Sequence, residues 1–141
     1  MAIVYANIGS NLGNRYELIQ KALDEIAGAF GICCISAYIE SEPWGFKSDN
    51  RFLNLGVSFK SDLAPEEILY KLQRIEKSVS QVSHRDEKGG YKDREIDIDI
   101  MAIDDMIIDS PSLTIPHRHL MDRDFFRVPL LELNPDWESP I

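Results

Sequence analysis

Residues 95–103 of this 141-residue chain read Glu95-Ile96-Asp97-Ile98-Asp99-Ile100-Met101-Ala102-Ile103. Acidic and apolar side chains alternate through the first six positions, which places the isoleucines on one face of an extended segment and the acids on the other. This pattern is typical of a β-strand that buries one face. We therefore expect a strand over residues 95–103, and its place after two helices decides which fold the chain can form.

Two amphipathic helices are expected before this strand. The first begins after Asn14, which can cap it, with Glu17 three residues further on as in a capping box. Its apolar stripe, at spacings of three and four residues, consists of Tyr16, Ile19, Leu23, Ile26 and Phe30. The second begins near Pro65, a residue favoured in the first turn, and its apolar stripe consists of Ile68, Leu72, Ile75 and Val79.

Three more strands are expected upstream. Residues 2–8 are apolar and β-prone, and a turn-rich stretch follows them at residues 9–14. Residues 32–39 form the second expected strand. The third, over residues 52–59, has one small and partly polar face and one core face, which carries Leu53, Leu55, Val57 and Phe59.

The resulting order, βαββαβ, predicts an α+β fold of the ferredoxin-like type, with one antiparallel sheet and both helices on one face. We expect the first and last strands to lie parallel in the middle of this sheet. A short C-terminal addition should follow, with a hairpin around residues 105–108 and a short helical stretch after Pro116-His117. The length predicts a single domain over residues 1–141.

The composition excludes some classes of function. The chain has 15 Lys and Arg against 24 Asp and Glu, a net charge of −9, which argues against general binding of nucleic acid or acidic membranes. It has no apolar run of about 18 residues and no signal-like start, so we expect a cytoplasmic location. The only cysteines, Cys33 and Cys34, are adjacent in an apolar stretch, and we expect buried thiols.

Asp97 and Asp99 are candidates for a metal site. They leave the same face of the strand with Cα atoms about 6.5 to 7 Å apart. Magnesium prefers oxygen ligands and commonly takes one or two carboxylates together with substrate phosphates, so the pair suits a site linked to ATP. The alternative is a solvated strand face on which alternating acids bind nothing.

Basic residues lie next to these acids in the sequence. Arg94 directly precedes the expected strand, and Arg85, Lys88 and Lys92 lie in the loop before it. Phosphoryl transfer depends on positioning and charge neutralisation, which such cations supply. A solvated charged loop is the alternative.

Two smaller groups could bind other parts of a substrate. His117 and Arg123 could donate to phosphate oxygens, although a loop histidine is more often structural. Phe52 and Asn54 share a strand face, and a loop bearing Trp44 precedes them, which would suit a flat heterocycle with hydrogen-bonding edges. Ordinary aromatic packing is the alternative.

Five stretches form one set across nearly the whole chain. They are Asn7-Ile8-Gly9-Ser10-Asn11-Leu12-Gly13, Phe52-Leu53-Asn54, Gln73-Arg74-Ile75-Glu76, Arg94-Glu95-Ile96-Asp97-Ile98-Asp99-Ile100, and Pro116-His117 with Arg123 and Phe125. In order and spacing this set closely resembles the 6-hydroxymethyl-7,8-dihydropterin pyrophosphokinase family of folate biosynthesis. The Asp-Ile-Asp-Ile strand preceded by arginine is specific when it occurs with the N-terminal Gly-Ser-Asn-Leu-Gly.

The resemblance implies a ferredoxin-like fold that binds MgATP and the pterin, transfers the β,γ-diphosphate to the exocyclic hydroxymethyl oxygen and releases AMP. It implies a catalytic group of Arg94, Asp97 and Asp99, in which the two aspartates hold two magnesium ions. The implied ATP contacts are Gln73, Arg85, Arg94, Ile100, His117 and Arg123. The implied pterin site has the ring between Phe52 and Phe125, its edge on Asn54, and further contacts from Ser41, Glu42, Trp44 and Tyr91.

The chain departs from the family pattern in its basic residues. Ser80-Gln81-Val82-Ser83 stands where the family usually carries Gly-Arg-any-Arg, and Lys92-Asp93-Arg94 stands where Gly-Pro-Arg is usual. Gly90 and Ser112 replace further arginines, and the chain stops at Ile141, shorter than typical members.

Three functions stay open on these residues. The first is an active pyrophosphokinase, either slower than usual or with Arg85, Lys88 and Lys92 acting in place of the missing arginines. The second is a degenerate relative that binds pterin or nucleotide with little turnover. The third is a plain ferredoxin-like interaction module. We expect a monomer.

Overall fold

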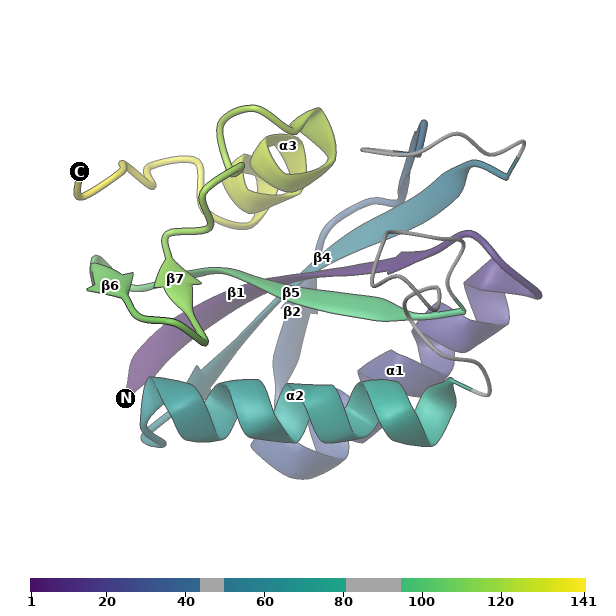
Figure 1. Cartoon of the computed structure of the whole chain (residues 1–141), viewed down its shortest axis with the longest axis horizontal. Helices are drawn as coiled ribbons and strands as arrows, with labels where there is room; N and C mark the ends of the chain where they lie inside the picture. The colour runs from purple at the N-terminus through teal and green to yellow at the C-terminus, as the bar shows by residue number, and fades with distance from the viewer. Residues whose placement is uncertain (44–49, 81–94) are drawn as a thin grey trace.

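A computed structural model of the chain describes residues 1–43, 50–80 and 95–141 (Figure 1). The predicted loop residues Trp44, Arg85, Tyr91 and Arg94, together with Lys88 and Lys92, lie outside these ranges. The elements are β1 (Ala2–Ser10), α1 (Arg15–Phe30), β2 (Cys33–Ile35), β3 (Ile39–Ser41), β4 (Phe52–Ser61), α2 (Pro65–Val79), β5 (Asp97–Ile103), β6 (Ile108–Asp109), β7 (Thr114–Ile115) and α3 (Asp124–Leu133).

The main sheet has the order β2-β4-β1-β5, with β3 also paired to β4, and every pairing is antiparallel. The ferredoxin-like α+β fold is therefore confirmed. The expectation that the first and last strands lie parallel in the middle is wrong, because β1 and β4 hold the middle and β5 lies at one end. Each helical connection passes over one intervening strand, so the strands that a helix joins are parallel but are not neighbours.

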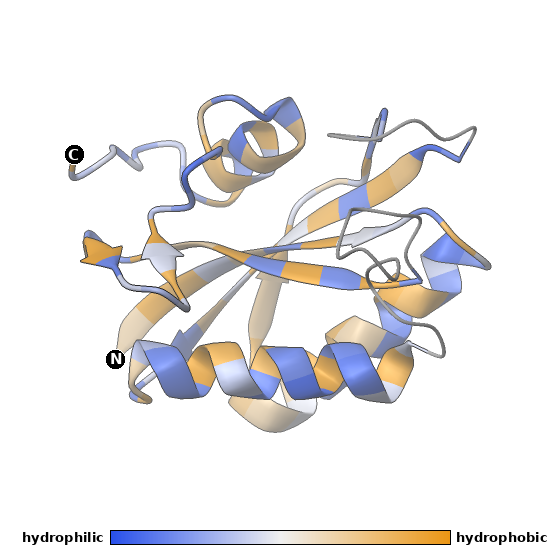
Figure 2. Cartoon of the chain, in the orientation of Figure 1, coloured by the Kyte–Doolittle hydropathy of each residue, from blue (hydrophilic) through white to orange (hydrophobic). Residues whose placement is uncertain are grey.

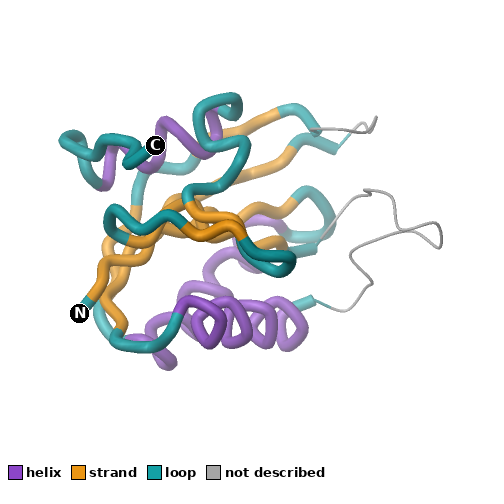
Figure 3. The backbone as a smooth tube through the Cα atoms, turned by 60° about the vertical axis from the view of Figure 1, so that its left-hand side comes forward, coloured by secondary structure: helices purple, strands orange, loops and turns teal. Residues whose placement is uncertain are grey.

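Helices α1 and α2 cover one face of the sheet, as expected (Figures 1 and 3). Asn14 caps α1, since its Oδ1 accepts a hydrogen bond of 3.1 Å from the Glu17 amide, and Pro65 is the first residue of α2. The apolar stripe of α2 is buried, and Figure 2 shows its alternation with polar residues. In α1, Tyr16 is exposed, and the buried residues are Leu18, Ile19, Ala22 and Ile26.

The opposite face of the sheet is partly covered by α3 (Figure 3). Its core consists of Tyr5, Met101, Ala102, Leu120, Phe126 and Leu130. A β-bulge between β1 and β5 falls between Tyr5 and Ala6, opposite Met101, so Met101 and Ala102 both join the α3 side while Ile103 joins the other core. The alternation that defines β5 in the sequence therefore ends after Ile100.

Gly56 is the contact point between the sheet and α3. A Cβ atom at this position would lie 2.7 Å from Cβ of Pro129 and 3.2 Å from Cδ1 of Leu133. This face of β4 was predicted to carry small side chains, and the reason is that α3 packs directly against it at Gly56.

Gly56→Ala should therefore destabilise the protein by about 1–3 kcal/mol, because the added methyl group overpacks the α3 interface. Urea unfolding measures the change. Gly28→Ala is the matched control, since nothing lies within 4 Å of that Cβ on α1 and alanine favours a helix by about 0.5–1 kcal/mol. Equal effects of the two substitutions would contradict the assigned packing.

The region expected as one strand over residues 32–39 is divided. The Ser36 amide donates to the Gly56 carbonyl at 2.9 Å, and the Gly56 amide donates to Oγ of Ser36 at 2.8 Å. This side chain interrupts the ladder, so β2 and β3 pair separately with β4. The expected burial of both thiols is also wrong: in the short strand β2, Cys33 is half-buried, with burial raising the pKa of its thiol, and Cys34 is exposed.

The C-terminal addition follows the expectation in outline. The hairpin is formed by β6 and β7, so its strands span residues 108–115 rather than 105–108. The helical stretch is α3, which follows residues 116–123. None of the helices in the described ranges is long and apolar enough to cross a membrane.

Candidate active site

Several polar side chains lie on the same sheet face as α3, next to the part of that face that α3 contacts. The register pairs Asn7 with Gly56 on β4 and with Asp99 on β5, and it pairs Gly9 with Asn54 and with Asp97. Paired residues of adjacent antiparallel strands share a face. Asn54, Asn7, Asp97 and Asp99 therefore lie on one face across three strands, opposite the isoleucines that contact α1 and α2.

Asp97 and Asp99 are half-buried at the start of β5. Within the described ranges, no cluster of three or more His, Cys, Asp or Glu residues could hold a metal by itself. A pair of carboxylates still fits magnesium, which takes oxygen ligands and completes its shell with water and substrate phosphates. The donor set thus suits a metal that arrives with a nucleotide.

Glu76 holds the edge of the same strand. The amide of Ile98 donates to Oε2 of Glu76 at 2.6 Å. Glu76 belongs to a motif noted in the sequence, but this anchoring role was not predicted. This hydrogen bond anchors β5 to α2 at Ile98, the residue between the two aspartates.

The predicted ATP residues Gln73 and Ile100 lie at this edge rather than on the carboxylate face. Gln73 is exposed on α2 about one helical turn before Glu76, whose carboxylate meets the edge of β5 at Ile98. The side chain of Ile100 is buried in the core, so only its main chain can contact a ligand.

Asn54 is held by a chain of side-chain hydrogen bonds. Its Oδ1 accepts from Nδ2 of Asn7 at 3.3 Å, and its Nδ2 donates to Oγ of Ser41 at 2.9 Å and to the Ile39 carbonyl at 3.3 Å. Gly9 makes room for this arrangement, because a Cβ there would lie 3.1 Å from Oδ1 of Asn54 and 3.5 Å from Cδ1 of Phe52. The predicted residues Ser41, Phe52 and Asn54 are thus brought together.

His117 lies beside β5, since its amide donates to the Met101 carbonyl at 2.9 Å. Burial lowers the pKa of its imidazole to about 4, with the charge of Arg123 adding to the effect and Asp97 opposing it. Nδ1 accepts a hydrogen bond of 3.1 Å from the His119 amide, so the neutral ring carries its proton on Nε2. At neutral pH His117 is an uncharged hydrogen-bond donor.

This pKa predicts a pH dependence of stability. Because the pKa of His117 is lowered from 6.5 to about 4 by folding, the unfolded chain binds more protons between these pH values, and stability falls as the pH drops through them. In the metal-free protein, the free energy of unfolding should fall by about 2 kcal/mol less in His117→Gln than in the wild type between pH 7.5 and pH 4.5. Urea unfolding of both proteins at pH 7.5 and pH 4.5 measures it, and parallel pH curves would contradict it.

Arg123 and Phe125 lie at the start of α3. The Arg123 guanidinium lies over the rings of Phe126 at 5.0 Å and Phe125 at 5.7 Å. The His117 ring meets Phe126 edge-on at 4.9 Å. Phe126 thus supports both predicted phosphate donors, and sequence reasoning gave it no role.

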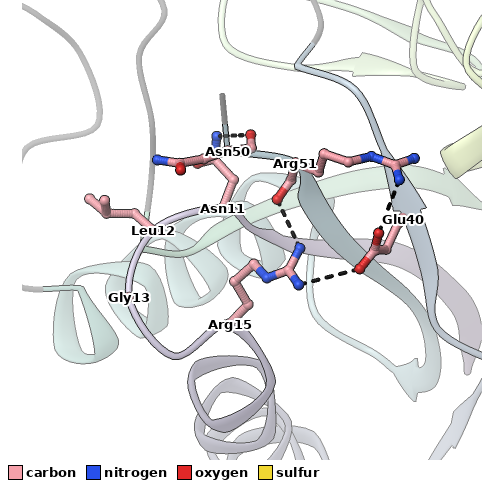
Figure 4. A pocket seen from close by; sticks show the side chains of 7 residues that line it. All are labelled: Asn11, Leu12, Gly13, Arg15, Glu40, Asn50 and Arg51. Carbon is pink, nitrogen blue, oxygen red and sulfur yellow. Dashed lines mark hydrogen bonds and ion pairs between the residues drawn. The ribbon is translucent and has the colours of Figure 1, made fainter. Parts of the chain in front are cut away.

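A surface pocket of about 450 Å³ lies where β1 ends, lined by residues 11–13, Arg15, Glu40, Asn50 and Arg51 (Figure 4). Arg15 donates to the Arg51 carbonyl at 2.9 Å and pairs with Glu40 at 3.3 Å, while Arg51 pairs with Glu40 at 3.3 Å and with Glu42 at 3.2 Å. The carboxylate of the predicted residue Glu42 is therefore engaged by Arg51. These exposed ion pairs add little stability.

The fold is a ferredoxin-like α+β fold, and one face of its sheet carries two carboxylates beside a pair of hydrogen-bonded amides. Residues 5–135 match the model of the family described as 7,8-dihydro-6-hydroxymethylpterin-pyrophosphokinase (HPPK). The chain belongs to this family, as its sequence motifs predicted.

Named relatives agree with this assignment. The 2-amino-4-hydroxy-6-hydroxymethyldihydropteridine pyrophosphokinase of Aquifex aeolicus is 41% identical over 141 residues, covering 100% of this chain and 86% of the relative. That of Porphyromonas gingivalis is 41% identical over 142 residues, covering 99% and 95%. A crystal structure of Plasmodium falciparum HPPK-DHPS superposes with a TM-score of 0.67 at 15% identity and supports the fold. This chain spans 43% of that longer chain.

Proposed function

We propose that the chain transfers the β,γ-diphosphate of MgATP to the hydroxymethyl group of 6-hydroxymethyl-7,8-dihydropterin in folate biosynthesis. The hydroxyl oxygen forms a bond to the β-phosphorus, the bond between that phosphorus and the bridging α,β-oxygen breaks, AMP leaves, and the hydroxyl proton passes to solvent. The observation that carries the proposal is the placement of Asp97 and Asp99 on the same sheet face as the Asn7–Asn54–Ser41 hydrogen-bond chain.

The two aspartates are proposed to hold two magnesium ions with the nucleotide. Bound there, the metal would neutralise phosphate charge and orient the diphosphate. The protein's own part is to keep both carboxylates on one face, which the β5 pairing with β1 and the Glu76 anchor at Ile98 support. We assign no strong general base to the hydroxyl.

The remaining ATP contacts are proposed on two sides of β5. His117 and Arg123 would donate to phosphate oxygens, His117 through Nε2 and without charge at neutral pH. Gln73 and the main chain of Ile100 would contact the nucleotide from the edge. Arg85 and Arg94, from the loop before β5, would add positive charge, with Arg94 in the catalytic group.

The pterin is proposed to lie against Asn54. Phe52 and Phe125 would stack on the ring, since Phe52 shares the face of Asn54 and Phe125 lies in the first turn of the helix that covers the neighbouring part of that face. Asn54 would bond the heterocycle edge, with Ser41, Glu42, Trp44 and Tyr91 completing the site. A flat ring with a polar edge matches aromatic faces beside an oriented amide.

We further propose that residues 1–141 act as one catalytic domain and as a monomer in the cytoplasm. Support for the single domain comes from the family match over residues 5–135 and from one sheet that both cores share. The free thiols of Cys33 and Cys34 fit a reducing compartment.

AMP formation from ATP, magnesium and 6-hydroxymethyl-7,8-dihydropterin tests the reaction, with magnesium-free and pterin-free mixtures as controls. We expect AMP only in the complete mixture. Binding of MgATP or pterin without AMP would instead support a degenerate relative, and would make the altered loop over residues 80–94 its cause. No magnesium-coupled ATP binding at all would support an interaction module.

A further inference from the structure

Asn7 is a polar residue at the centre of the sheet. It lies on β1 between β4 and β5, is only 3% exposed, and pairs with Gly56 on one side and Asp99 on the other. Its neighbours in sequence, Ala6 and Ile8, belong to the apolar core on the opposite face. An amide in such a place needs a reason, because burying a polar group is costly unless it is hydrogen-bonded.

Stability does not supply that reason. The Nδ2 group of Asn7 donates to Oδ1 of Asn54, but the Oδ1 atom of Asn7 is buried and meets no hydrogen-bond donor in the part of the chain that the structure describes. A buried acceptor left in this state costs about 1–3 kcal/mol, comparable to or more than one hydrogen bond contributes. The residue is therefore better explained by what it does to Asn54.

The contacts of Asn54 favour one orientation of its carboxamide. In the observed orientation Oδ1 accepts from Asn7, while Nδ2 donates to the Ile39 carbonyl and to Ser41. A flipped carboxamide would put its Oδ1 against the Ile39 carbonyl and its Nδ2 against the Nδ2 group of Asn7. The Ile39 carbonyl can only accept, so it excludes the flipped orientation, and Asn7 then holds the observed one through its hydrogen bond to Oδ1.

We propose that Asn7 is a positioning residue for the pterin: its hydrogen bond holds the Asn54 carboxamide in the orientation that the Ile39 carbonyl selects, with Oδ1 as the acceptor for the heterocycle edge. The inference rests on the proposed function and assigns a residue that the sequence motifs did not. Both N–H groups of Asn54 are donated within the protein, so the second lone pair of Oδ1 is the group left to accept from an N–H or amino group of the ring edge. Asn7 also lies beside Asp99 in the sheet, on the strand between Asn54 and the carboxylates that are proposed to hold the metal.

A double-mutant cycle between Asn7→Ala and Asn54→Ala tests the role. The readouts are KM for dihydropterin and KM for MgATP in the AMP assay, and dihydropterin binding in the presence of a non-hydrolysable MgATP analogue. Asn7→Ala should raise KM for the pterin about five- to tenfold, the effect of one hydrogen bond, and leave KM for MgATP within about twofold. In the Asn54→Ala background the same substitution should have no further effect on the pterin, because the residue acts through Asn54.

Tyr5→Phe is the matched control. Tyr5 lies on the same strand and face, and its hydroxyl accepts a hydrogen bond of 3.1 Å from Nδ2 of Asn134 beneath α3. Its loss should lower the melting temperature and leave both KM values unchanged. Asn7→Leu keeps the γ-branched shape of the side chain without its polar atoms, and it replaces Asn7→Ala in the cycle if the alanine variant does not fold.

The outcomes distinguish failure of the proposed function from failure of the role of Asn7. A wild-type protein that makes no AMP in the complete mixture overturns the proposed function, and the role of Asn7 with it. A wild-type protein that turns over, with an unchanged pterin KM in Asn7→Ala or with additive effects of Asn7→Ala and Asn54→Ala, overturns only the role of Asn7. Equal increases in both KM values would show a general structural effect and also overturn it.

Discussion

Asp97→Asn and Asp99→Asn should each lower kcat/KM for diphosphate transfer by at least about 10³-fold while the protein stays folded. Both side chains are half-buried on the sheet face that carries the candidate site. The amide keeps the shape of the carboxylate but removes the negative charge that a magnesium ion requires, and metal stabilisation of phosphate charge contributes several kcal/mol. Steady-state AMP formation at saturating magnesium measures the loss.

Asp109→Asn is the control for these two substitutions. Asp109 is an exposed acid of β6, and its change alters the net charge by the same amount. It should keep wild-type kcat/KM. Thermal unfolding of all three variants separates loss of chemistry from loss of fold, and near wild-type rates in either Asp97→Asn or Asp99→Asn would falsify the metal assignment.

Arg123→Met should lower kcat by about 10²-fold or more, since removing one donor to a developing phosphate charge typically has this effect. The guanidinium lies over Phe126, which also packs against His117, so its charge sits where the phosphates are proposed to bind. The same substitution has a second signature. Because Arg123 helps to lower the pKa of His117, its removal should raise that pKa above about 4, which NMR titration of the imidazole in the metal-free protein detects.

Arg127→Met is the matched control for Arg123. Arg127 lies one turn later on α3 and forms an ion pair of 2.6 Å with Asp124. Its loss removes the same charge from the same helix and should leave both kcat and the His117 titration unchanged. A wild-type kcat in Arg123→Met, or an equal loss in Arg127→Met, would remove Arg123 from the proposed phosphate site.

Much of the fold was predictable because its signals are local. The isoleucine and aspartate alternation of β5 depends only on the two-residue period of a strand, and the start of α1 depends on Asn14 and Glu17 three residues apart. The wrong predictions concern features that depend on contacts between segments far apart in the chain. Ser36 divides the second strand through its bonds to Gly56, and the short β2 leaves Cys34 exposed.

The candidate site was predictable in part. Asp97, Asp99, Phe52 and Asn54 were assigned to the faces on which the structure has them. Asn7 was quoted in a motif but given no role, although a single amide within the apolar segment at residues 2–8 was a usable signal. Its contact with Asn54 spans 47 residues, and no periodicity within one strand can reveal it.

The sequence by itself determined the order of helices and strands, the acidic face of β5 and the family. These follow from spacing within one segment and from motifs in a fixed order. Only the tertiary structure decided the strand order, the bulge at Met101, the cover of α3 over Gly56 and the link from Asn7 to Asn54. Each of these depends on hydrogen bonds or close packing between segments far apart in the chain, whose register is set only when the whole sheet has formed.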